Sequence, residues 1–248
     1  IVVGRDQSLA KILKKCAHSR HMWDVWRDWC HFTALALRNS MDRVGWQERE
    51  DQYLAIVARY ERADIDRFVE AFTVLVAELE AEPRDVLGET YMLLEIASKD
   101  MGQFYTPWHL CRLMAEMTME GAVQQLEEKS FITVNDPTVG GGAMLIAASV
   151  ELQARGVNPQ TQAYWVAQDL SEIAVYQTYI QMSLLGLPGV VIRQNTITED
   201  VYEVWPTWRH IFDGWDYRLR AENTILEAEC REPVADVMVP AMEQLELF

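Results

Sequence analysis

The stretch VNDPTVGGGAML, residues 134–145, runs from apolar residues into Asp136-Pro137 and then into three consecutive glycines. Glycines let a backbone adopt positive φ and approach a ligand closely, and the amino end of a helix offers unpaired N–H groups to an anion. The spacing differs from the GxGxxG of dinucleotide sites and lacks the GKS or GKT of a P-loop. An acid followed by a glycine loop instead suits a ligand with both an ammonium and a carboxylate, such as the amino-acid end of S-adenosylmethionine.

The sequence around this loop predicts a parallel sheet. Short apolar runs that read as strands alternate with helical stretches from about residue 107 onward, which is typical of βαβ units. The predicted strands are FITVN (131–135), AYWVAQ (163–168) and VVIRQ (190–194). The predicted helices are 143–155 and a second that begins after Ser171 and runs to about Leu185, before GLPG at 186–189.

A second acid, Asp169, follows the second predicted strand, 33 residues after Asp136. At the carboxyl edge of a parallel sheet it is well placed to accept hydrogen bonds from two ribose hydroxyls. The two features together predict a cofactor that contains a nucleoside. The alternative is a tight strand-to-helix turn that binds no ligand.

Residues 1–100 predict an N-terminal helical domain. They contain three glycines and one proline, and their apolar residues recur at three- and four-residue spacing. The expected helices lie within 7–38, with a break, and at 47–61, 64–81 and 85–97. We expect a cofactor-binding domain over 101–220 and a tail over 221–248.

The composition predicts a soluble cytoplasmic protein. Half of the 248 residues are hydrophobic, but no apolar run reaches the roughly 18 residues of a membrane span and no signal peptide is evident. The four cysteines form no CxxC pair, so neither a disulfide framework nor a zinc site is expected.

The net charge of −16 opposes binding to phosphate backbones. It favours either a partner that supplies basic surface or a role other than DNA binding. The oligomeric state, homomeric or heteromeric, stays open.

Five motifs resemble the modification subunits of type I restriction-modification systems, which are adenine-N6 DNA methyltransferases. They are DVLGETY (85–91), GQFYTP (102–107), DPTVGGGAML (136–145), AQDLSE (167–172) and RQNTI (193–197). The resemblance covers roughly residues 85–197, and GQFYTP is its most specific motif. It implies an α/β, Rossmann-like S-adenosylmethionine-dependent methyltransferase fold, with S-adenosylmethionine as cofactor and DNA as substrate.

The resemblance also implies roles for individual residues. A segment that closes over the methionine portion of the cofactor would comprise Gln103, Tyr105, Thr106 and Pro107. The loop that holds the amino-acid moiety would comprise Asp136, Pro137, Thr138, Gly140, Gly141 and Gly142. Asp169, followed by Leu170, would bind the ribose, and Asn195 would lie near the adenine ring.

One motif of the family is missing from this sequence. The catalytic tetrapeptide, Asn or Asp followed by Pro-Pro and an aromatic residue, accepts hydrogen bonds from the amine of a flipped adenine and stacks on the base. It occurs nowhere after residue 197, so no catalytic residue is assigned. Two hypotheses remain: a methyltransferase whose partner completes the target-base pocket, and a catalytically inactive methylase-like module with a binding or regulatory role.

The strand order of the family places the first strand in the centre of the sheet. The chain continues for only about 50 residues after the third predicted strand, so an abbreviated fold is one expectation. Its exposed edge would need cover from residues 200–220 or from a second subunit.

The last five residues, QLELF, resemble the peptide by which bacterial replication and repair proteins bind the sliding clamp. The resemblance implies that Leu245, Leu247 and Phe248 fill apolar pockets and that Gln244 hydrogen-bonds at the rim. The alternative is a tail that packs on its own domain.

Three further groups have a functional and a structural interpretation. Trp23, Trp26 and Trp29 could stack on bases, but three-residue spacing on a helix favours a core. The histidines and cysteines between residues 16 and 31 match no common metal pattern. An aromatic group after the third strand, for which packing is favoured over reception of a flipped base, comprises Tyr202, Trp205, Trp208, Phe212, Trp215 and Tyr217.

Overall fold

The computed structural model describes residues 8–18, 20–94 and 106–229, the side chains of 223–229 excepted. Before the sheet, the helices are α1 (Leu9–Lys14), α2 (Met22–Met41), α3 (Trp46–Val57), α4 (Arg62–Ala81), α5 (Val86–Leu93), α6 (Trp108–Thr118) and α7 (Ala122–Glu128). The later helices are α8 (Ala143–Ala154), α9 (Glu172–Leu184), α10 (Trp208–Phe212) and α11 (Trp215–Glu229).

The sheet has four strands in the described residues, in the order β1-β2-β3-β4. β1 (Ile132–Asp136), β2 (Ala163–Asp169) and β3 (Gly189–Asn195) are parallel, and β4 (Asp200–Pro206) is antiparallel to β3. The α/β fold class and the three predicted strands are confirmed. Ser171 caps α9 as predicted, because its hydroxyl accepts a hydrogen bond from Ala174 N.

Among the described strands β1 pairs with β2 alone and forms an edge, which is the exposed edge expected of an abbreviated sheet. The other edge of the sheet differs from the sequence-based expectation. The segment after residue 199, expected only to cover an edge, forms β4 and extends the sheet beyond β3. Trp205 is its buried residue, whereas Val201, Tyr202 and Val204 are exposed.

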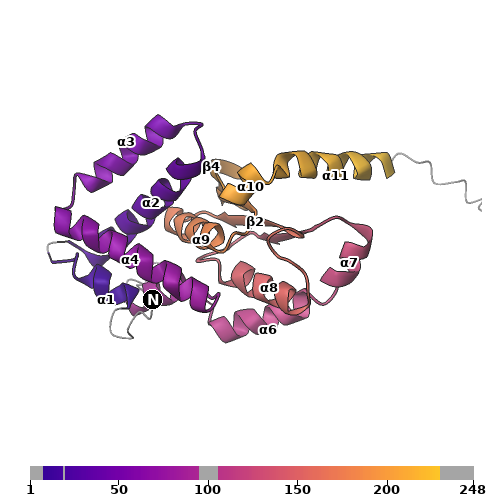
Figure 1. Cartoon of the computed structure of the whole chain (residues 1–248), viewed down its shortest axis with the longest axis horizontal. Coiled ribbons are helices and arrows are strands. Elements are labelled where there is room, and N and C mark those ends of the chain that lie inside the picture. Colours follow the sequence, from indigo (N-terminus) through magenta and orange to yellow (C-terminus); the bar gives the residue numbers. More distant parts are fainter. Residues whose placement is uncertain (1–7, 19, 95–105, 230–248) are drawn as a thin grey trace, which may run out of the picture.

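The two faces of the sheet are covered by different helices. α8 and α9 lie on one side and α10 with the start of α11 on the other, and α11 then projects away from the sheet (Figure 1). On the α8–α9 side the strands contribute fully buried side chains such as Trp165 and Val191. On the other side Trp215 is completely buried and contacts the rings of Phe131 and Tyr164.

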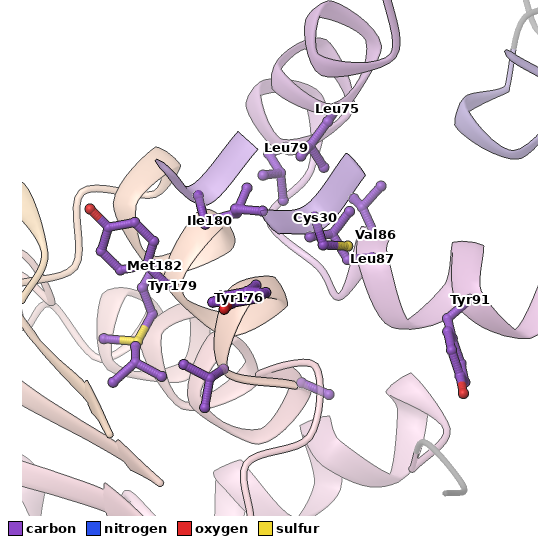
Figure 2. Close-up of a cluster of buried hydrophobic side chains, with 14 of the residues drawn as sticks. Cys30, Leu75, Leu79, Val86, Leu87, Tyr91, Tyr176, Tyr179, Ile180 and Met182 are labelled. Carbon is purple, nitrogen blue, oxygen red and sulfur yellow. The ribbon is translucent and has the colours of Figure 1, made fainter. Parts of the chain in front are cut away.

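One hydrophobic cluster joins the N-terminal helices to the sheet. Figure 2 shows its centre, where Tyr176, Tyr179 and Ile180 of α9 lie among side chains of α2, α4 and α5. α9 therefore has the helical region on one side and β2 and β3 on the other, which explains why most of its residues are buried. The division at residue 100 stays a prediction, and the core is continuous across it.

The tryptophan stripe of α2 belongs to this core. Trp26 and Trp29 are fully buried with ring centroids 5.6 Å apart, and the indole N–H of Trp29 donates to the carbonyl of Phe68. Trp23 is partly buried against the same cluster. The core interpretation is confirmed for Trp26 and Trp29, which leaves no ring face of theirs open to a base.

The aromatic group after β3 divides into packed and exposed members. Trp205 and Trp215 are buried, and the indole N–H of Trp208 donates to Ser183 O at 2.8 Å. Large exposed surfaces remain on Tyr202, Phe212 and Tyr217. The packing interpretation is therefore confirmed for Trp205 and Trp215 and is wrong for the three exposed rings.

Cys16, Cys30 and Cys111 are buried free thiols. Within 8–18, 20–94 and 106–229, no three His, Cys, Asp or Glu side chains are grouped so as to hold a metal ion. None of the helices in these ranges is both long enough and apolar enough to cross a bilayer.

Candidate functional site

The carboxyl ends of the three parallel strands meet at one edge of the sheet. Asp136 ends β1, Asp169 ends β2 and Asn195 ends β3, and the register of the strands places these ends side by side. Because ligands of open α/β sheets bind outside the carboxyl ends of the strands, this edge is the candidate site.

The glycine loop between β1 and α8 has the backbone conformation that glycine permits. Gly140 has φ of 55° and Gly142 has φ of 97°, and Gly142 is the N-cap of α8. Among the described residues no side chain caps this helix, and no acid lies in its first turn. The amino end of α8 thus presents N–H groups and the positive end of the helix dipole to the site, which suits a carboxylate.

Asp169 supports the loop in addition to facing the site. Its Oδ2 accepts a hydrogen bond from Gly140 N at 3.0 Å and its Oδ1 accepts one from Ser171 N at 2.8 Å. A carboxylate has about four acceptor positions, so capacity remains for two ligand hydroxyls. The single side chain therefore both fixes the loop and is available to a ribose.

We predict that Asp169→Asn lowers the stability of the ligand-free protein by about 1–2 kcal/mol, because only one amide oxygen remains for two backbone donors. Urea unfolding followed by circular dichroism measures the effect. An unchanged unfolding midpoint would contradict the loop-holding role that these two hydrogen bonds give Asp169.

Asp136 carries an unfavourable charge in the ligand-free protein. Burial raises its pKa above the ordinary value, the backbone hydrogen bond from Thr138 N lowers it, and the nearby negative charge of Asp169 raises it further. Two carboxylates close together at the mouth of a glycine loop form an anionic site. A ligand with a positive charge would relieve this repulsion.

Other residues expected in the cofactor site occupy different positions around it. Thr138 and Pro137 are exposed beside the loop, and Pro137 O accepts a hydrogen bond from Thr196 Oγ1 at 2.8 Å. Asn195 uses its side-chain oxygen to accept hydrogen bonds from the amides of residues 197 and 198, which leaves its amide nitrogen for a ligand. Leu170 is 57% exposed.

The segment that leads into α6 lies beside α5. Thr106, Pro107 and Trp108 line one cavity of about 520 Å³ together with residues of the 85–93 stretch. Cys111, whose thiol contacts Thr106 O, has its pKa raised to about 11 by burial and by the negative charges of Asp85 and Asp136. Cys111 therefore lies within electrostatic range of Asp85 in the 85–91 motif and of Asp136 in the 136–145 motif. Gln103 and Tyr105 lie outside the described residues.

Two polar side chains on the buried face of α9 were not predicted from the sequence as part of the site. Thr178 Oγ1 donates to Gly140 O at 2.9 Å, and Gln181 Nε2 donates to Gly141 O at 2.6 Å. Both side chains are completely buried. The signal in the sequence is the presence of Thr178 and Gln181, together with Gln177, among the apolar residues of a predicted helix, since buried polar groups need partners.

The fold and the site define an α/β protein with a candidate ligand site at the carboxyl edge of its parallel strands, formed by a glycine loop and two acids. The family model described as N-6 DNA Methylase matches residues 82–214, which is more than half of the chain. The protein belongs to this family.

No curated protein matches the sequence. One similar solved structure is a type I restriction-modification system methyltransferase subunit from Streptococcus thermophilus, with 17% sequence identity and a TM-score of 0.40. The alignment covers 80% of this chain and 58% of that subunit.

Proposed function

We propose that the protein binds S-adenosylmethionine and takes part in methyl transfer to the N6 amine of adenine in DNA. The observation that carries the proposal is the uncapped, glycine-rich amino end of α8 next to two neighbouring carboxylates. This site lies within the region that matches the N-6 DNA methylase family.

The donor groups of the site fit the parts of this cofactor. The amino end of α8 and Gly140–Gly142 suit the carboxylate, Asp136 suits the ammonium, and Asp169 suits the ribose hydroxyls. Thr106 and Pro107, with Gln103 and Tyr105 by resemblance, would close over the methionine portion. Leu170 and Asn195 would border the adenine ring. The cofactor supplies an electrophilic methyl group, and the residues of this chain bind and orient it.

A partner subunit would supply the pocket for the target base. Support comes from β1, which has a neighbour on one side only among the described strands. An unpaired strand edge presents backbone N–H and C=O groups to other chains, and proteins normally cover or protect it.

The exposed side of α6 gives further support for a partner. α6 packs against α8, and its buried side chains are Cys111 and Ala115. Its other apolar side chains, Leu110, Leu113, Met114 and Met117, are 43–70% exposed at the i, i+3, i+4, i+7 spacing of a packing face. A contiguous apolar stripe of this kind marks an interaction surface.

We predict that the isolated chain does not bind duplex DNA with a Kd below about 10⁻⁴ M at 150 mM salt. The net charge is −16, and many arginines already pair with acids of the same chain. The ion-paired arginines are Arg27, Arg38, Arg49, Arg59, Arg62, Arg67, Arg84, Arg155, Arg193 and Arg209. Fluorescence anisotropy with a labelled duplex measures the affinity. Micromolar binding would show that no basic partner is needed.

The proposed function is tested by transfer of a labelled methyl group from S-adenosylmethionine to unmethylated DNA, with Asp136→Ala as the control. Label in adenine N6 with the wild type alone supports the enzyme. Cofactor binding without any incorporation, both by the isolated chain and by its complex with the partner subunit, supports the second candidate, an inactive binding module, which the net charge of −16 favours. Absence of cofactor binding contradicts both candidates.

Recruitment to a sliding clamp stays a prediction. Gln244, Leu245, Leu247 and Phe248 lie outside the described residues.

A further inference from the structure

We infer that Gln181 is a positioning residue that couples the glycine loop to α5, so that the N-terminal helical region is part of the cofactor site. The expected effect of Gln181 on cofactor binding rests on the proposed function. The coupling itself is a property of the protein without ligand.

Gln181 makes three hydrogen bonds from a completely buried position on α9. Its Nε2 donates to Gly141 O at 2.6 Å and to Asp85 Oδ1 at 2.8 Å, and its Oε1 accepts from Leu87 N at 3.2 Å. One N–H of this amide therefore donates to the glycine loop and the other to the N-cap residue of α5. Because an unmet hydrogen bond is costly in a buried site, movement of either neighbour affects the other.

Asp85 forms the α5 end of this connection. It is the N-cap of α5, where its Oδ1 also accepts a hydrogen bond from Gly88 N at 2.8 Å. Burial raises the pKa of Asp85, and the hydrogen bonds from Gln181 and Gly88 lower it. The hydrogen bond from Gln181 thus offsets part of the cost of burying the charged carboxylate of Asp85. The carboxylate in turn caps the start of α5.

The two ends of the connection belong to two different parts of the candidate site. Gly141 lies in the loop that presents the amino end of α8. Asp85 lines the cavity that Thr106, Pro107 and Trp108 also line. Gln181 therefore connects the loop proposed to hold the amino-acid moiety with the wall proposed to cover it, although 56 residues separate Asp85 and Gly141 in sequence.

The first experiment needs no cofactor. Amide hydrogen exchange is measured on Asp85→Ala. This substitution removes no hydrogen bond of the glycine loop directly, so it can affect the loop only through Gln181. We expect exchange at the hydrogen-bonded loop amides of Gly140 and Gly142 to rise about tenfold over the wild type. Asp85→Asn, which keeps an acceptor for Gly88 and Gln181, restores slow exchange. Unchanged loop exchange in Asp85→Ala would overturn the coupling.

The second experiment measures cofactor binding by titration calorimetry. Gln181→Leu is expected to raise the Kd for S-adenosylmethionine about tenfold. Gln160→Leu is the matched control, because Gln160 also donates to a backbone carbonyl, that of Leu185, but precedes β2 and so lies at the amino edge of the sheet. An equal Kd for wild type and Gln181→Leu would overturn the role of Gln181 in the site. If the wild type itself binds no cofactor, the proposed function fails while the exchange experiment still decides the coupling.

Discussion

Asp136→Asn is expected to weaken S-adenosylmethionine binding about ten- to hundredfold. The carboxylate is the proposed partner of the cofactor's ammonium, and a hydrogen bond to a charged group is worth about 1.5–3 kcal/mol. Titration calorimetry at pH 7.5 measures the change in Kd. A Kd within twofold of the wild type would remove Asp136 from the site.

The same substitution is expected to preserve or increase the thermal stability of the ligand-free protein. The folded-state pKa of Asp136 is raised, so its stabilising contribution is present below the unfolded pKa and is lost as pH rises through the folded value. At neutral pH the wild type carries the full penalty of the buried charge, and Asn does not. The amide oxygen can still accept the hydrogen bond from Thr138 N. A large fall in melting temperature would show that the residue is structural.

Cofactor affinity should also depend on pH through Asp136. As pH falls through the raised pKa, the carboxylate is protonated and loses its attraction for the ammonium, so affinity falls. The fall should begin at a higher pH than an ordinary aspartate would give, because the pKa is raised. In Asp136→Asn this dependence should disappear, which calorimetry across an acidic pH series checks.

Gly189→Ala is expected to destabilise the protein by about 3 kcal/mol or more, the upper end of overpacking effects. A Cβ at this position would lie 1.9 Å from the carbonyl oxygen of Trp165, at the first pair of the β2–β3 register. The backbone cannot retreat, because Gly189 N donates to Thr207 Oγ1 and Gly189 O accepts from Thr207 N. Urea unfolding measures the loss, and failure to accumulate as folded protein is the extreme form of the same result.

Gly156→Ala is the control for this substitution. Gly156 has φ of 81°, and a Cβ there would meet nothing within 4 Å, so only backbone strain of about 1–2 kcal/mol is expected. Equal losses for the two variants would contradict the steric origin assigned to Gly189.

The sequence predicted the sheet because each βα unit has strong local signals. A short strand-like run that contains apolar residues ends at Asp136 or Asp169, and a glycine loop or a capping serine then begins the next helix. These signals are local in sequence, so they also located the candidate carboxyl edge. Gly189 was interpreted only as part of a helix-ending turn, because the close approach of Trp165 O depends on strand pairing.

The remaining features depend on contacts between distant segments. The edge position of β1 and the pairing of β4 with β3 are set by tertiary structure, and no residue of β1 reveals how many neighbours it has. The role of Gln181 likewise arises from hydrogen bonds to residues 40 and 96 positions earlier. A single polar residue on an apolar helix face indicates that a partner exists, but it does not identify the partner.

The central claim is that the glycine loop and the two acids bind S-adenosylmethionine. A crystal structure of the protein grown with this cofactor tests it most directly. We expect the cofactor's carboxylate at the amino end of α8, its ammonium at Asp136 and its ribose at Asp169. A loop that remains empty at saturating cofactor, or that is filled by the protein's own side chains, would rule out this binding site.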